Sequence, residues 1–157
     1  GKLYKKDKKI FNKLKKALPK YIYSFPVNKH EISKAILANK FNLKKIIKIV
    51  HLEVRKKMNI FLKKNTNKKI VILDIPLLLE NKINKKKDIL IFVQSEKTKI
   101  LQRLKERQNF NLKLLNKFRK IQLPLSYKKK KSQYIIKNDF TKRTVKKGIQ
   151  IILKEIL

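Results

Sequence analysis

Apolar residues recur every three or four positions over several long stretches of this chain, a spacing that predicts amphipathic helices. The first half of the sequence predicts three such helices, over residues 7–18, 28–37 and 41–62. The second half predicts three more, over residues 96–107, 112–121 and 141–157. Pro19 closes the first helix, and Asn28 with Glu31 three residues later has the pattern of an N-terminal capping box. Residues 21–25, before Pro26, predict a short extended segment.

Two continuous apolar runs interrupt the helical spacing. Residues 69–76 and 88–93 are apolar almost throughout, as expected of strands that are buried on both faces, and residues 134–136 form a shorter run of the same kind. Apolar strands that alternate with helices predict an α/β fold with a parallel sheet. Three short strands are too few to fill such a sheet, so the pattern indicates part of a larger one.

Length and composition limit the class of protein further. The 157 residues suffice for one domain with a hydrophobic core. Cysteine is absent, which excludes thiol nucleophiles and Cys-ligated metal sites, and the two histidines, His30 and His51, are far apart. The sequence has neither a run of about 18 apolar residues nor an apolar stretch at its start, and we expect a cytoplasmic protein without a membrane partner.

The net charge of +35 is the feature that would ordinarily indicate a nucleic-acid partner. Arg occurs at only 5 positions, so 40 of the 45 basic residues are Lys, and they are spread along the whole chain. A protein that reads bases more often uses Arg, whose planar guanidinium pairs with guanine and phosphate in a bidentate way. We therefore expect no specific nucleic acid as partner and keep a basic RNA-associated protein as the alternative.

Several residues are candidates for chemistry. Asp74 ends an apolar run, where ligands bind in open α/β sheets, although it could equally cap the following turn. Arg103 and Arg107 lie four apart in one predicted helix and could face one phosphate, or form an ordinary exposed helix face. His51 and Arg55 share a face of the helix over 41–62, where a lone histidine is more often packed than catalytic.

The segment before the last short strand predicts a polar linker. Read without further context, Gln122, Pro124 and Lys128 are loop residues. Tyr127 and Tyr134 could stack on a base, and core packing is the alternative for both.

Taken in order, four segments resemble the dephospho-CoA kinase family. They are Asp74-Ile-Pro-Leu-Leu-Leu-Glu80, Leu101-Gln-Arg-Leu-Lys-Glu-Arg107, Gln122-Leu-Pro-Leu-Ser-Tyr-Lys128 and Ser132-Gln-Tyr-Ile-Ile-Lys-Asn138. The family's segments read approximately D-x-P-L-L-F-E, L-x-R-x-x-x-R, Q-x-P-x-x-x-K and A-D-Y-V-I-D-N. Upstream, residues 51–55 are similar to the family's H-P-x-I-R, with Leu52 in place of proline. The resemblance covers residues 28–138.

This resemblance implies a P-loop kinase-like, three-layer α/β fold with a parallel sheet, a helical substrate-binding insertion and a lid. The reaction it implies is ATP-dependent phosphorylation of the 3′-hydroxyl of dephospho-CoA, the last step of CoA biosynthesis, with Mg²⁺ as cofactor. By position, Arg103 matches the catalytic lid arginine at the ATP phosphates and Arg107 a second one, while Asn138 approaches the ATP base. The residues implied to bind dephospho-CoA are Asp74, Pro76, Leu77, Leu78, Glu80, His51 and Arg55.

The chain departs from the family at its start. The family begins with a strand, a G-G-I-G-S-G-K-S phosphate loop and a D-A-D segment with the catalytic base, whereas this chain has Gly only at positions 1 and 148. Leu3-Tyr4 is similar to the H-x-L-Y that follows D-A-D. We therefore expect one partial domain over 1–157 that lacks the first two strands and begins about forty residues late, judged by the length of a complete phosphate-loop unit. Its expected parts are a helical insertion over 5–66 and an α/β core over 68–157 with the lid near 103–125. A non-catalytic dephospho-CoA-binding pseudoenzyme is the second alternative.

Overall fold

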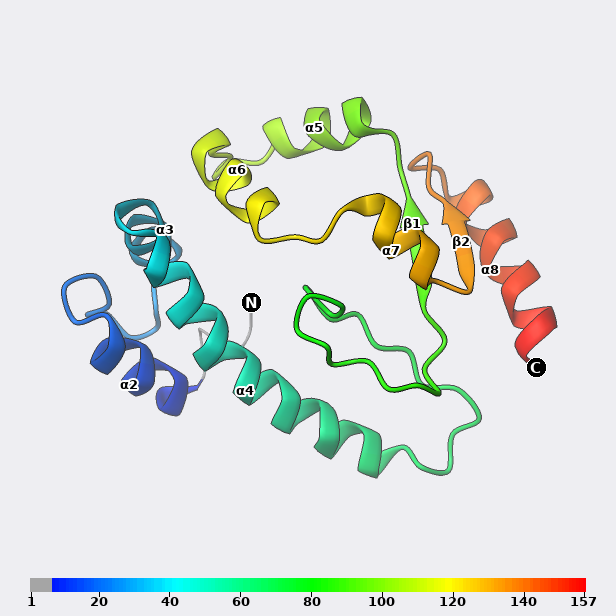
Figure 1. Cartoon of the computed structure of the whole chain (residues 1–157), viewed down its shortest axis with the longest axis horizontal. Helices are drawn as coiled ribbons and strands as arrows, with labels where there is room; N and C mark the ends of the chain where they lie inside the picture. The colour runs from blue at the N-terminus through cyan, green and yellow to red at the C-terminus, as the bar shows by residue number, and fades with distance from the viewer. Residues whose placement is uncertain (1–6) are drawn as a thin grey trace. The chain divides into compact units, whose positions relative to one another are not determined.

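The computed structural model describes residues 7–157 of the chain, and Leu3 and Tyr4 lie outside this range. The chain divides into two compact units, residues 1–74 and 75–157, which are described separately below. Figure 1 shows the elements of the first unit from blue to teal and those of the second from green to red.

The first unit consists of three helices, α2 (Lys8–Ala17), α3 (Lys29–Ala38) and α4 (Lys40–Lys64), as the periodicity predicts (Figure 1). Each begins at a polar N-cap whose side chain accepts a hydrogen bond from the first turn. These caps are Asp7, Asn28 and Asn39. The apolar faces meet in a core in which Ile10, Leu14 and Ile22 are fully buried. The stripe of apolar residues on each helix therefore supplies the burial that holds the unit together.

The segment before α3 differs from its prediction. Residues 21–25 form a turn and bends instead of an extended stretch. Their backbone is held by Glu31, which is buried and whose carboxylate accepts hydrogen bonds from the Tyr23 N–H at 3.1 Å, from the Ser24 N–H at 3.4 Å and from the Ser24 hydroxyl. The predicted capping box is thus only half formed, because Glu31 binds this segment while Asn28 caps the helix alone.

The apolar run over 69–76 is the clearest error of the prediction. In the structure these residues form no strand, and Ile72 is 82% exposed. The run has the composition of a buried strand, but a strand exists only where a neighbour supplies hydrogen bonds. Among the described residues, no segment pairs with it.

The second unit contains a two-stranded parallel sheet. Strand β1 (Ile91–Gln94) pairs with β2 (Tyr134–Lys137), with Ile91 opposite Tyr134 and Gln94 opposite Lys137. The parallel direction agrees with the prediction. The predicted burial on both faces does not, because Val93 is 56% exposed. Two of the three predicted strands form, and the prediction that further strands precede them stays a prediction.

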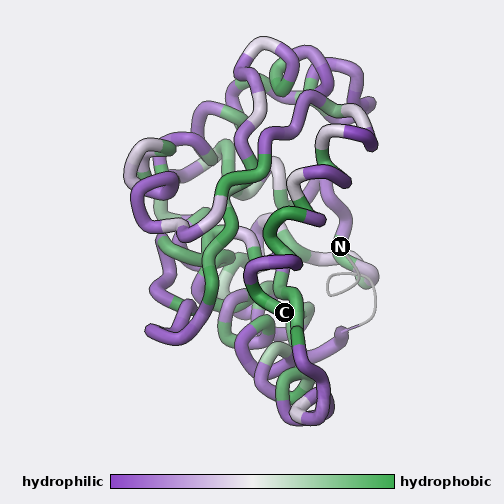
Figure 2. The backbone as a smooth tube through the Cα atoms, turned by 90° about the vertical axis from the view of Figure 1, so that its right-hand side faces the viewer, coloured by the Kyte–Doolittle hydropathy of each residue, from purple (hydrophilic) through white to green (hydrophobic). Residues whose placement is uncertain are grey.

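Four helices complete this unit: α5 (Lys97–Lys105), α6 (Leu112–Lys120), α7 (Leu125–Lys131) and α8 (Lys142–Ile156). Helix α8 packs closely on β2 at Gly148, where an added Cβ would lie 3.3 Å from Cγ2 of Ile136. Figure 2 shows that apolar and polar stretches alternate along the backbone.

Helix α7 was not expected, because its sequence is polar and predicts a loop. The structure starts it at Pro124, which occupies the N-cap, and places Lys128 on the helix. Its hydrophobic spacing is weak, and no residue of α7 is buried. Lys128 on this helix forms an ion pair with Glu80, a contact between distant segments that a local pattern cannot predict.

Candidate functional site

A pocket of about 610 Å³ lies in the second unit, at the ends of its two strands. Asn138 directly follows β2, and its N–H donates to the carbonyl of Gln94, the last residue of β1, at 2.8 Å. The carboxyl ends of parallel strands are where open α/β folds bind ligands, and the volume suits a nucleotide-sized molecule. The pocket is lined by Arg103, Asn138, Phe140, Thr141, Lys142, Val145, Lys146, Ile149 and Gln150.

The turn between β2 and α8 forms one wall of this pocket and is fixed by its own side chains. Asn138 Oδ1 accepts the Phe140 N–H at 2.8 Å. Asp139 accepts the N–H of Thr141 at 2.9 Å, the hydroxyl of Thr141 at 2.8 Å and the hydroxyl of Thr144 at 2.8 Å. These hydrogen bonds lower the pKa of Asp139 to about 2. The turn is therefore a rigid element, and Asp139 is ionised at neutral pH.

Phe140 occupies an unusual backbone position in this turn. Its φ is 71°, in the left-handed region, which costs a bulky L-residue about 1–2 kcal/mol. Its ring lies against the guanidinium of Arg103, with 4.7 Å from Cζ to the ring centroid. The sequence signal for the turn was the polar pair Asn138-Asp139 before the Thr141 cap, but nothing in the sequence identified Phe140 as a pocket residue.

The structure separates the two arginines that the sequence placed on one helix face. Arg103 is on α5 and lines the pocket. Helix α5 ends at Lys105, and Arg107 lies in the bend that follows, where its N–H donates to the carbonyl of Leu104 at 3.2 Å. This hydrogen bond spans three residues instead of four, so the last turn tightens and the predicted continuation of the helix to residue 107 is wrong.

The pocket combines positive charge with an apolar wall. Arg103, Lys142 and Lys146 supply three cations, while Phe140, Val145 and Ile149 supply the apolar surface. An anion that carries a flat, weakly polar group fits this combination. No three His, Asp or Glu side chains come together among the described residues, and Asp139 is committed to its own turn.

A second group of predicted residues lies in the loop over 76–82, also in the second unit. The loop is a series of turns in which Leu77 adopts a φ of 57° and its carbonyl accepts the backbone N–H of Asn81 at 3.1 Å and the Asn81 side-chain amide at 2.7 Å. Leu77, Leu78 and Glu80 are half-buried, and Pro76 is exposed. These bonds hold the loop in one shape.

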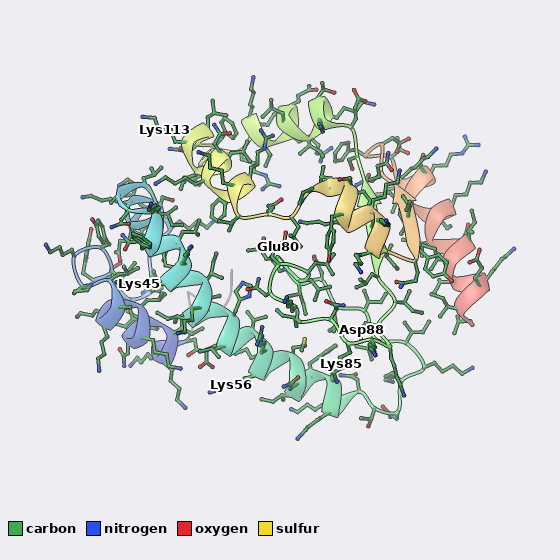
Figure 3. All side chains as sticks on the ribbon, in the orientation of Figure 1. Lys45, Lys56, Glu80, Lys85, Asp88 and Lys113 are labelled. Carbon is green, nitrogen blue, oxygen red and sulfur yellow. The ribbon has the colours of Figure 1, made fainter. Side chains whose placement is uncertain are left out.

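Glu80 connects this loop to the segment around α7. Figure 3 labels Glu80. Its Oε1 lies 2.6 Å from Nζ of Lys128 and accepts the N–H of Leu123 at 3.0 Å. Burial by itself raises the pKa of Glu80, but the hydrogen bonds from Lys128 and Leu123 outweigh burial and lower it. Oε1 of Glu80 is thus already bonded to groups of the protein itself.

The remaining predicted residues belong to the first unit. On α4, His51 has a buried Nδ1 without a hydrogen-bond partner within the described part of the chain. Burial, and then the charge of Arg55, lower the pKa of His51, so the imidazole is neutral at pH 7. Arg55, one turn later, is exposed, as is Asp74 at the end of this unit.

The structure therefore brings together Arg103 and Asn138, and it holds Glu80 beside Lys128. It also adds pocket residues that the sequence analysis missed, namely Phe140, Lys142 and Lys146. A turn signal followed by lysines in a chain rich in lysine does not distinguish a binding residue from an ordinary surface residue.

Over residues 7–157, no helix is both long and apolar enough to cross a bilayer.

Comparison with known proteins gives one consistent result. The family model described as "Dephospho-CoA kinase" matches residues 2–143. A dephospho-CoA kinase of Wolbachia pipientis is 31% identical over 156 residues, which cover 98% of this chain and 80% of the relative. One of Bacillus cereus is 31% identical over 82% of this chain and 66% of the relative. One of Rickettsia prowazekii is 28% identical over 96% and 78%, respectively.

Proposed function

Because the chain belongs to the dephospho-CoA kinase family, we propose that it serves the ATP-dependent phosphorylation of the 3′-hydroxyl of dephospho-CoA, which yields CoA. The observation that carries this proposal is the pocket at the strand ends, where Arg103 and Asn138, brought together from separate elements, lie beside two lysines. Kinase catalysis depends mainly on positioning and on stabilising charge, and this pocket has residues for both tasks.

On the donor side, we assign Asn138 to the ATP base and Arg103 to the phosphates. The Oδ1 of Asn138 already accepts a backbone N–H, which leaves its amide N–H groups as donors to a base. Arg103 carries a permanent charge and several donors, which suits the charge that develops on the transferring phosphoryl group. Arg107 lies two residues beyond the end of α5, in the expected lid over 103–125, and is the second candidate for phosphate contact.

On the acceptor side, we assign the dephospho-CoA contacts to Asp74, Pro76, Leu77, Leu78 and Glu80, with His51 and Arg55 from the helical unit. The exposed guanidinium of Arg55 suits a phosphate, and the neutral imidazole of His51 suits a hydrogen bond without adding charge. Mg²⁺, when bound with ATP, neutralises phosphate charge in this class of reaction. A Gly-rich phosphate loop is not among the 157 residues, so the roles proposed for these residues are binding, orientation and charge stabilisation.

The test is ADP release by the gene product purified from its natural source, measured with ATP and Mg²⁺. We expect release that requires dephospho-CoA and stops when 4′-phosphopantetheine, which lacks the ribose hydroxyl, replaces it. Binding of dephospho-CoA without ADP release would instead indicate a non-catalytic binding protein. Undiminished affinity for RNA near 0.15 M salt, without binding of dephospho-CoA, would overturn the proposal in favour of an RNA-associated protein.

A further inference from the structure

Phe140 is the pocket residue whose backbone conformation is least typical of its residue type. It holds a left-handed φ of 71°, which Gly or Asn adopts at lower cost. The position is nevertheless fixed, because Asn138 bonds the Phe140 N–H and Asp139 bonds the residues that follow. A strained residue held by a rigid turn points to a role for its side chain.

The ring of Phe140 has one specific partner, the guanidinium of Arg103 at 4.7 Å. Arg103 is exposed and lies on α5, 37 positions away in the sequence, so this contact joins two segments that are distant in the chain. A long exposed side chain loses much rotamer freedom when it is fixed in one place, and a stacked aromatic face reduces that loss. The distance of 4.7 Å leaves no room for a base between ring and guanidinium, since two stacked layers need roughly 7 Å.

We propose that Phe140 is a positioning residue that holds the guanidinium of Arg103 at the pocket, where it meets the phosphates of the bound nucleotide. This inference rests on the proposed function for the identity of the nucleotide. It adds a residue that acts through Arg103 and not through contact with the base. The left-handed turn fixes the ring of Phe140, and this ring holds the guanidinium of Arg103 in place.

The test compares Phe140→Asn with the wild-type protein, because Asn removes the ring while tolerating the left-handed backbone. Binding of ATP, tripolyphosphate and adenosine is measured by calorimetry. We expect Phe140→Asn to weaken ATP and tripolyphosphate by the same factor, roughly two- to fivefold, and to leave adenosine unchanged. Phe140→Tyr restores both affinities, and the unfolding midpoint of Phe140→Asn stays equal or rises because the backbone strain is relieved.

A double-mutant cycle with Arg103→Met shows whether Phe140 acts through Arg103. In that background, Phe140→Asn is expected to have no further effect on ATP binding. The matched control is Phe41→Leu, which removes the cation–π contact of Lys40 with Phe41 at 5.3 Å and leaves nucleotide affinity unchanged.

Three outcomes overturn the inference: unchanged ATP affinity in Phe140→Asn, a full additional loss in the Arg103→Met background, or a loss confined to adenosine. The last would assign the ring to base stacking. Failure of the proposed function looks different, because the wild-type protein would then bind ATP and respond to both variants as expected, yet release no ADP with dephospho-CoA.

Discussion

The two units of the molecule bury their apolar residues to very different degrees. Of the eleven apolar residues that form the buried core over 7–157, nine belong to the helical unit, and only Ile136 and Ile152 belong to the unit with the sheet. A helix satisfies its own backbone and needs only one covered face, so three helices can close a core among themselves. A parallel sheet needs cover on both faces and partners along its edges.

Most of the buried core therefore lies in one unit, and the candidate pocket lies in the other. The helical unit contains the fully buried Ile10, Leu14 and Ile22, whereas the sheet unit contains the pocket with Arg103 and Asn138. Substitutions of the buried apolar residues in the first unit are therefore expected to act mainly on unfolding, and substitutions at the pocket mainly on the reaction. Measurements of unfolding and of turnover in single variants can test whether core and pocket residues differ in this way.

The largest effect is expected from Arg103→Ala in the active gene product. Loss of a charge that stabilises the transferring phosphoryl group lowers turnover by roughly 10³-fold, as for arginines that serve phosphoryl transfer elsewhere. The Kd of dephospho-CoA changes little, because this arginine is assigned to the donor side. Steady-state kinetics and calorimetry measure the two quantities, with the exposed Arg143→Ala as control. Equal losses in turnover and dephospho-CoA affinity would contradict the role of Arg103.

The next largest effect is expected on stability, from Leu14→Ala in the helical unit. Leu14 is fully buried, so truncation leaves a cavity and lowers the free energy of unfolding by about 2–5 kcal/mol. Val93→Ala, on a strand residue that is 56% exposed, is the matched control and is expected to change it by less than about 0.5 kcal/mol. Urea unfolding followed by circular dichroism measures both. A comparable loss in the two variants would show that the sheet has a buried face after all.

A smaller effect is expected from Lys128→Met, which breaks the Glu80–Lys128 ion pair. The loss leaves a mostly buried carboxylate with one backbone donor and lowers the free energy of unfolding by about 1–3 kcal/mol. Lys56→Met, which removes a 67%-exposed partner of Glu53, is the control and costs less than about 1 kcal/mol.

The same ion pair predicts a pH dependence with a definite sign. Folding lowers the pKa of Glu80 from 4.5, so the stabilisation is fully present above that pH and is lost as the pH falls through the lower pKa of the folded protein. The stability difference between wild type and Glu80→Gln should therefore shrink on acidification below 4.5. A difference that is constant with pH would show that the carboxylate charge does not contribute.

The smallest effect concerns Asp139 in the turn of the pocket. Its carboxyl carbon is expected to titrate in the NMR spectrum with a midpoint of about 2, and the stability it gives the turn is present above pH 3.8 and lost as the pH falls through that midpoint. Thr144→Val removes one of its hydrogen bonds and raises the midpoint toward 3.8. Thr98→Val, beside Glu96, is the control and leaves it unchanged. A wild-type midpoint near 3.8 would contradict the rigid turn.

The helices were predictable to within a few residues because their signals are local. Asp7, Asn28 and Thr141 are polar caps that stand immediately before apolar stripes, and each caps its helix in the structure. Helix α7 escaped prediction because its sequence is mostly polar and Lys128 binds a residue 48 positions earlier. The end of α5 before Arg107 likewise depends on a tightened last turn that no residue type specifies.

The candidate site was predictable in part. Arg103 and Asn138 were singled out from motifs, and the structure confirms only that both line one pocket. The role of Phe140 had no sequence signal, because its left-handed backbone and its contact with Arg103 arise from the hydrogen bonds of Asn138 and Asp139. Glu80 was expected at a substrate, and the structure adds its bonds to Lys128 and Leu123.

The sequence by itself determined the helices other than α7, the α/β alternation and the order of the family motifs, because each depends on residues that are close together in the chain. Only the tertiary structure decided which apolar run became a strand. Residues 69–76 have the composition of a strand but pair with no segment within 7–157, while residues 91–94 and 134–137 pair with one another. It also decided that Arg103 meets Phe140 and that Glu80 meets Lys128. Pairing, stacking and burial are relations between distant segments, so no local pattern can specify them.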